Sequence, residues 1–158
     1  KKPSAGHHIR IKEDKPKNSD RQSTAVLAEY FQNADELVSI VKDDRLYTFP
    51  KKHYSLFAYL MKKLFIRQTG IFAGNQKEKN FIPSEELALA IDLRKVIASV
   101  DVDLETALNY LRCENISLPG VATGWTIIKY QNFPLGWVKV LDRRVNNYFP
   151  KEWRILKK

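Results

Sequence analysis

The C-terminal segment 124–158 combines aromatic and basic side chains in a pattern that suits RNA binding. It holds all three tryptophans of the chain. It also contains eight basic and two acidic residues, so the segment carries +6 of the formal net charge of +9. Aromatic rings can stack on bases, and lysine and arginine can hold phosphates. We therefore expect a polyanionic partner to bind at this end of the protein.

Eight residues of this segment are the candidates for direct RNA contact. The five cations among them would bind phosphates and supply affinity and orientation, but little sequence information. Trp137 and Tyr148 could stack a base, and the amide of Asn147 could read a base edge or only serve the end of a strand. The predicted RNA-binding residues are Trp137, Lys139, Arg143, Arg144, Asn147, Tyr148, Lys151 and Arg154.

A core position competes with base stacking for each tryptophan, because tryptophans bury a large area in a small β-rich domain. Trp125 and Trp153 are predicted to lie in the core, whereas the sequence leaves both roles open for Trp137. Gly136 precedes it, and a glycine inside a strand allows another group to approach closely. The approaching group could be RNA or a packed helix.

The rest of the chain shows no pattern typical of catalysis, metal binding or membrane insertion. The whole chain of 158 residues is 44% hydrophobic and 28% charged, as in a soluble globular protein. No apolar run reaches the roughly 18 residues of a membrane span, and no signal peptide is evident, which predicts a cytoplasmic location. Cys113 has no evident base or cation beside it, and His7 and His8 are not expected to bind a metal.

Apolar periodicity and turn residues predict an α+β fold. Helices are expected at four places, 23–34, 51–63, 84–93 and 104–111. Strands are expected at 6–12, in a hairpin over 37–49, at 64–69, and at 125–130, 134–141 and 144–148, with a loop or hairpin at 70–81. A second basic cluster accompanies the predicted helix 51–63, either as a solvated face or as an RNA contact. Its members are Lys51, Lys52, Lys62, Lys63 and Arg67.

Short motifs follow one another along most of the chain. Near the C-terminus they are Gly124-Trp125, Pro134-Leu135-Gly136-Trp137, Lys139, Asn147-Tyr148, and Pro150-Lys151 with Arg154. Upstream they are YLRCE at 110–114, FIPS at 81–84 with Leu87-Ala88, and GHHI at 6–9. In this order they resemble the C-terminal RNA-binding, PUA-like region of bacterial 16S rRNA cytosine-5 methyltransferases of the RsmF type, within the Nol1/Nop2/Sun family. Asn80, Glu85 and Cys113 depart from the family's pattern.

The resemblance implies a small mixed β-barrel of the PUA type with a helix–hairpin–helix subdomain packed on it. The implied divisions are 1–22 for the end of a preceding catalytic domain and a linker, 23–63 for the subdomain, and 64–158 for the PUA-like RNA-binding domain. The polar stretch 13–22, which has no aliphatic or aromatic side chain, agrees with a linker.

The resemblance also implies that these residues do not catalyse a reaction themselves. Such methyltransferases need a domain that binds S-adenosylmethionine, with a glycine-rich loop and catalytic cysteines, and this sequence has neither pattern. The chain is therefore expected to hold no cofactor and to dock 16S rRNA or the small ribosomal subunit for an N-terminal methyltransferase domain in cis. The alternatives are a module that packs on the catalytic domain and a free-standing RNA-binding protein.

Overall fold

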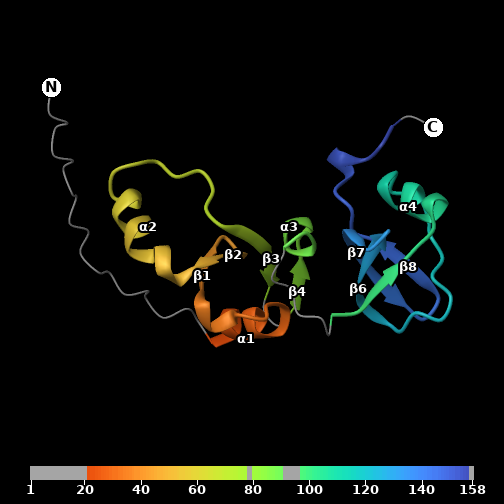
Figure 1. Ribbon diagram of the computed structural model, residues 1–158, viewed down its shortest axis with the longest axis horizontal. Coiled ribbons are helices and arrows are strands. Elements are labelled where there is room, and N and C mark those ends of the chain that lie inside the picture. Colours follow the sequence, from red (N-terminus) through yellow and green to blue (C-terminus); the bar gives the residue numbers. More distant parts are fainter. Residues whose placement is uncertain (1–20, 78–79, 91–96, 157–158) are drawn as a thin grey trace, which may run out of the picture.

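The computed structural model describes residues 21–77, 80–90 and 97–156, which form two four-stranded sheets placed along the long axis of the molecule (Figure 1). The α+β class predicted from the sequence is confirmed. The strand predicted at 6–12 and nearly all of the predicted linker lie outside the described residues.

The first sheet is antiparallel throughout, with the strand order β1-β2-β3-β4. Its strands are β1 (Leu37–Lys42), β2 (Arg45–Pro50), β3 (Ile71–Lys77) and β4 (Asn80–Pro83). The predicted β1–β2 hairpin is present, because Asp43 and Asp44 adopt the left-handed conformation that its two-residue turn requires, with φ of 51° and 61°. The predicted loop or hairpin at 70–81 is the β3–β4 hairpin.

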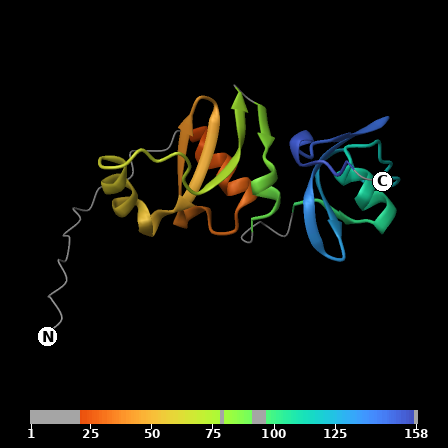
Figure 2. The ribbon, with the colours of Figure 1, turned by 90° about the horizontal axis from the view of Figure 1, so that it is seen from above.

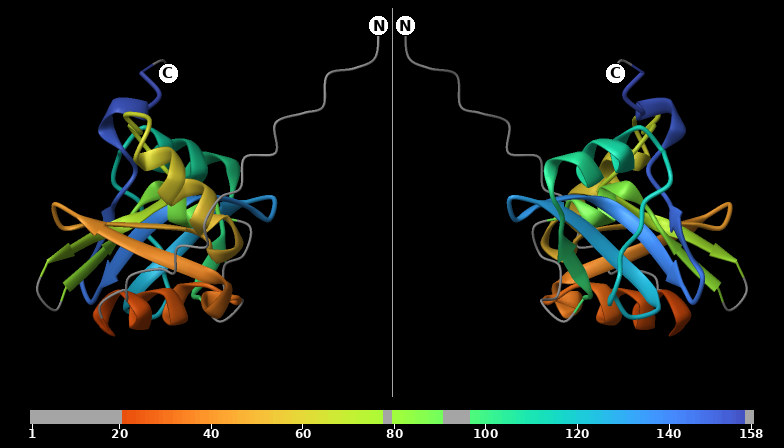
Figure 3. Two further views of the ribbon diagram at one scale, coloured as in Figure 1. Left: turned by 90° about the vertical axis from the view of Figure 1, so that its left-hand side faces the viewer. Right: turned by 90° about the vertical axis from the view of Figure 1, so that its right-hand side faces the viewer.

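Helix α1 (Arg21–Tyr30) covers one face of the first sheet (Figure 3). The predicted apolar face of this helix is buried, with Val26, Leu27 and Tyr30 in one cluster with Leu46 of β2. The 3-10 helix η1 (Ala34–Glu36) connects α1 to β1. The opposite face of the sheet is not covered by α1.

The predicted helix 51–63 is the 3-10 helix η2 (Lys51–His53) followed by α2 (Tyr54–Met61). The strand predicted at 64–69 is wrong, since this segment is a loop. Both edges of the preceding strand β2 are already paired, with β1 on one side and with β3 on the other. The loop ends at Gly70, where φ is +61° and a Cβ atom would collide with the Thr48 carbonyl oxygen of β2.

The second sheet has the strand order β5-β6-β7-β8. Its strands are β5 (Ser99–Asp101), β6 (Gly124–Tyr130), β7 (Phe133–Leu141) and β8 (Arg144–Asn147). The last three were predicted, whereas β5, which pairs in parallel with β6, was not. Helix α4 (Leu104–Leu111) begins as predicted, with the Asp103 carboxylate accepting a hydrogen bond from the Thr106 backbone N–H at 2.8 Å.

Strand pairing corrects the predicted division at 63/64. Strand β3 pairs with β2 and β4 pairs with β3, so both belong to the first sheet and not to the PUA-like unit. The described strands thus form two separate four-stranded sheets, and the pairing does not show the predicted closed barrel. Helix α3 (Glu85–Ala88) is shorter than expected, although the rest of the predicted helix falls largely within 91–96, outside the described residues.

The side chain of Trp137 joins the two sheets. It is fully buried, and its indole Nε1 donates a hydrogen bond to the Ser84 carbonyl oxygen at 2.8 Å. The ring edge meets the ring of Tyr30 from α1, with centroids 5.8 Å apart. Ile127 of β6 and Leu87 of α3 are buried in the same cluster. The two sheets therefore share one hydrophobic core where they meet.

Candidate nucleic-acid interface

The register of β6, β7 and β8 places several predicted RNA-binding side chains on one face of the second sheet. Trp125 lies opposite Lys139, Lys139 opposite Asn146, and Leu141 opposite Arg144. Side chains alternate between the two faces of a strand, and directly opposed residues share a face. We call this surface the tryptophan face; it comprises Trp125, Trp137, Lys139, Leu141, Arg144, Asn146 and Tyr148.

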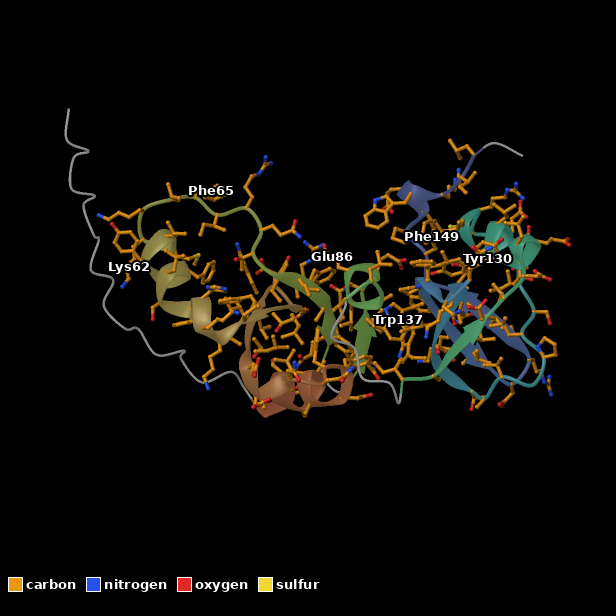
Figure 4. All side chains as sticks on the ribbon, in the orientation of Figure 1. Lys62, Phe65, Glu86, Tyr130, Trp137 and Phe149 are labelled. Atoms are coloured by element: carbon orange, nitrogen blue, oxygen red, sulfur yellow. The ribbon has the colours of Figure 1, made fainter. Side chains whose placement is uncertain are left out.

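The tryptophan face is covered at one end and open at the other. Trp137 lies at the covered end, beneath α1 and α3, with no exposed surface. A base cannot reach a ring in this position, so of the two roles left open for Trp137 the core position is the one observed. Figure 4 shows it directed toward the junction of the two sheets.

Trp125, Tyr148 and Lys139 form a cation–aromatic cluster beside the covered end. The rings of Trp125 and Tyr148 meet edge to face, with centroids 4.5 Å apart. The Lys139 ammonium lies 5.3 Å from the centre of the Trp125 ring, which is a favourable cation–π position. Trp125 was predicted as a core residue and is half-buried, while Tyr148 is 36% exposed. The cluster therefore presents an aromatic surface and a positive charge to solvent together.

Arg143 and Arg144 extend the positive charge beyond this cluster. Both are exposed, Arg143 in the β7–β8 turn and Arg144 as the first residue of β8. The alternation of side chains along β8 places Arg144 on the tryptophan face. Tyr148, four residues later, directly follows β8 and lies on the same face. Asn146 lies between them on that face and is half-buried.

Asn147 points to the other face of the sheet, where its amide holds the structure together. Its Nδ2 donates to the Tyr110 carbonyl oxygen at 2.8 Å, and its Oδ1 accepts from the Phe149 backbone N–H at 2.9 Å. Both hydrogen-bonding groups of the amide are thus engaged within the protein. Of the two roles left open for Asn147, these hydrogen bonds support the structural one at the end of the strand.

Lys151 and Arg154 form a separate basic group around the 3-10 helix η3 (Lys151–Trp153). Both are exposed, and the Ile155 backbone N–H donates to the Leu111 carbonyl oxygen, which ties this segment to the end of α4. Trp153 between them is 58% exposed, so its predicted core position is wrong. The ring still touches Phe149, with centroids 6.5 Å apart. The structure therefore divides the predicted cations between two places.

Glu85 is a buried carboxyl at the junction of the sheets. Neither of its oxygens has a hydrogen-bond partner, and burial raises the pKa of this carboxyl from 4.5 to about 8. Burial, followed by the charge of Glu85, also raises the pKa of the Tyr110 hydroxyl. A Cβ atom at Gly136 would collide with both side chains. Of the two explanations for Gly136, close approach by packed helices is therefore the one observed, since α3 and α4 supply these side chains.

Other chemistry is sparse in the part of the chain that the structure describes. There, no three histidine, cysteine or acidic side chains come together as metal ligands, and no helix is long and apolar enough to cross a membrane. Cys113 is half-buried, with its sulfur 3.7 Å from the Phe149 carbonyl oxygen.

Residues 98–155, which contain the second sheet, α4 and η3, match the family described as the methyltransferase RsmF PUA domain. This unit is therefore similar to a PUA domain of the RsmF type, and the resemblance found in the sequence is confirmed.

The chain is also similar to the ribosomal RNA small subunit methyltransferase F of Shewanella loihica (strain ATCC BAA-1088 / PV-4). The two are 24% identical over 141 residues, which cover 84% of this chain, so the similarity reaches into the first sheet. They cover 28% of the relative. The chain thus spans little more than a quarter of the relative's length.

Proposed function

We propose that this chain is the RNA-binding, non-catalytic part of an rRNA (cytosine-5) methyltransferase. It would dock 16S rRNA, alone or in the small ribosomal subunit, for a methyltransferase domain of the same protein, and that domain would bind S-adenosylmethionine. The match of residues 98–155 to a PUA domain and the name of the similar methyltransferase support this function.

The cluster of Trp125, Tyr148 and Lys139 is the observation that carries the proposal. Tyr148 offers a partly exposed ring to a base, and Lys139 offers a positive charge 5.3 Å from the Trp125 ring centre. Arg143 and Arg144 would continue the contact by binding phosphates along the β7–β8 hairpin. Because phosphate contacts set orientation and stacking tolerates any base, this surface suits docking better than sequence reading.

Lys151 and Arg154 would supply a second set of phosphate contacts beside α4. Trp153, exposed between them, adds a ring that can stack on a base. RNA that touches both sets would pass around the end of the second sheet, which would fix its direction relative to the rest of the enzyme.

The salt dependence of binding to in vitro transcribed 16S rRNA tests the proposal. We expect a steep loss of affinity with salt, and Arg143→Ala, Arg144→Ala and Lys151→Ala should each lower the slope of log K against log salt by about 1. Lys52→Ala is the matched control, since Lys52 is equally exposed but shares a hollow with Asp35 and Glu36. It should leave the slope unchanged.

The same measurement separates the alternatives. Binding that is undetectable or independent of salt would contradict RNA docking and leave a module that packs on a catalytic domain. A free-standing RNA-binding protein would bind RNA in the same way, but its gene would not encode a methyltransferase in the same reading frame.

A further inference from the structure

An open groove on the first sheet lies outside the contacts proposed for the PUA domain. It has a volume of about 260 Å³ and lies between the β1–β2 hairpin, α2 and the loop that follows α2. Its lining includes three cations, one carboxylate and two aromatic rings. These side chains are Lys42, Arg45, Arg67, Asp43, Tyr47 and Phe57.

Cations and aromatic rings meet along this groove. The Arg45 guanidinium carbon lies 5.0 Å from the centre of the Phe72 ring, and the Tyr47 ring centre lies 5.3 Å from the same ring. Leu46, between Arg45 and Tyr47, is fully buried in the core beneath α1. Alternation along β2 therefore directs Arg45 and Tyr47 to the face that α1 leaves open.

The loop after α2, which lines this groove with Ile66 and Arg67, also carries an exposed ring on its outer side. Phe65 is 92% exposed, and Figure 4 shows it on the outside of the loop, away from the sheets. Lys62, Lys63 and Arg67 flank it in the sequence. A ring so exposed adds almost nothing to the core, whereas an exposed ring among cations is the usual platform for a base of single-stranded RNA.

We propose that this groove and the loop beside it bind single-stranded RNA as a second contact surface. Lys42, Arg45 and Arg67 would hold phosphates, and Phe65 would stack on a base. An acidic protein surface could also face the three cations, but a base and its phosphate account for the exposed ring and the charges together. The pairing of a cation with an aromatic ring, seen at Lys139 and Trp125, is repeated here by Arg45 and Phe72.

The inference rests on the proposed function and extends it to the other end of the molecule. Figure 2 shows α2 and the second sheet at opposite ends. One RNA bound to both surfaces would lie along the whole length of the protein. The first sheet would then be part of the docking platform and not only a support for the PUA domain.

Binding of the full chain to in vitro transcribed 16S rRNA tests the inference. Phe65→Ala should weaken binding roughly 5- to 150-fold, the range for one lost stacking contact, and Phe65→Trp should retain it. Leu64→Ala is the matched control, because Leu64 is the neighbouring residue and is 58% exposed but has no ring; it should change affinity less than about 2-fold. The double variant Arg45→Ala/Arg67→Ala should lower the salt slope by about 1.4.

The outcomes distinguish this inference from the function on which it rests. If the wild-type chain binds RNA and Arg144→Ala weakens it, while the Phe65 and Arg45/Arg67 variants bind normally, the groove is not an RNA site and the PUA contact stands. If these variants bind RNA normally but no longer bind the separately purified methyltransferase domain, the groove is a protein-docking surface. If the wild-type chain binds no RNA, both proposals are wrong.

Discussion

The two four-stranded sheets differ in what covers their faces. The first sheet has α1 on one face, and the β1–β2 part of the sheet borders the open groove. The second sheet packs its core against α4 on one face and against α1 and α3 on part of the other. Among the described residues, these helices leave the Trp125–Lys139–Arg144 end of that second face uncovered. Two sheets with the same number of strands therefore differ in which part of their surface could meet a partner.

The comparison shows that an aromatic residue near cations is not by itself a binding residue. Trp137 and Phe65 both have basic residues within a few positions in the sequence, yet Trp137 has no exposed surface and Phe65 is 92% exposed. The difference comes from the neighbouring elements. Helices α1 and α3 cover Trp137, whereas nothing among the described residues covers Phe65.

The largest expected effect tests whether the sheets depend on their common core. Trp137→Ala should lower the free energy of unfolding by about 3–5 kcal/mol, because it removes a fully buried ring and its hydrogen bond to Ser84. Trp153→Ala should change it by less than about 0.5 kcal/mol, because Trp153 is 58% exposed. Urea denaturation measures both values. Equal losses for the two tryptophans would refute the assignment of Trp137 as the residue that joins the sheets.

A pH effect of comparable size should come from the same junction. The folded chain holds the Glu85 proton more tightly than the unfolded chain, so this group stabilises the fold fully below pH 4.5, and the contribution is lost as the pH rises through about 8. The free energy of unfolding should fall by up to about 1.4 kcal/mol per pH unit in this window. Glu85→Gln should remove the decline.

Glu105→Gln is the control for this pH effect, because Glu105 is exposed in the first turn of α4. Denaturation at a series of pH values should show the wild-type decline in this variant. The Tyr110 hydroxyl, which faces Glu85, stays protonated throughout because its own pKa is raised. A wild-type stability that does not change between pH 5 and pH 8 would contradict the raised pKa of Glu85.

The smallest expected effect comes from substituting two adjacent residues whose side chains lie on opposite faces of the second sheet. Asn147→Ala should lower stability by about 2 kcal/mol, because it removes two hydrogen bonds, and should leave RNA affinity unchanged. Asn146→Ala should change stability by less than about 0.5 kcal/mol and weaken RNA binding. Urea denaturation and filter binding give the two quantities. The reverse pattern would show that the faces have been assigned wrongly.

Local patterns in the sequence were sufficient for most of the secondary structure. Hydrophobic periodicity gave α1, α2 and α4, and the two-residue turns at Asp43-Asp44 and Gln131-Asn132 gave two hairpins. Hydrophobic periodicity could not assign strands to sheets. The alternation of apolar and polar residues shows which face of a strand is buried, but not which other strand pairs with it. The predicted division at 63/64 failed for that reason.

The register between β6 and β7 was the second feature of the candidate site that the sequence could not predict. Counting back from the turn at Gln131-Asn132 would place Trp125 opposite Val138, but a bulge between Ile128 and Lys129 places it opposite Lys139. A shift of one residue moves a side chain to the other face of a sheet. The cluster of Trp125, Tyr148 and Lys139 therefore could not be derived from spacing alone.

The sequence by itself determined the helices, the hairpins, the excess of positive charge near the C-terminus and the resemblance to the RsmF PUA region, because all of these depend on residue type and local order. Only the tertiary structure decided which aromatic rings are free to meet RNA. Exposure depends on helices that arrive from distant parts of the chain, as α1 and α3 do at Trp137. Burial there, and its absence at Phe65, are properties of packing and are not recorded in the local sequence.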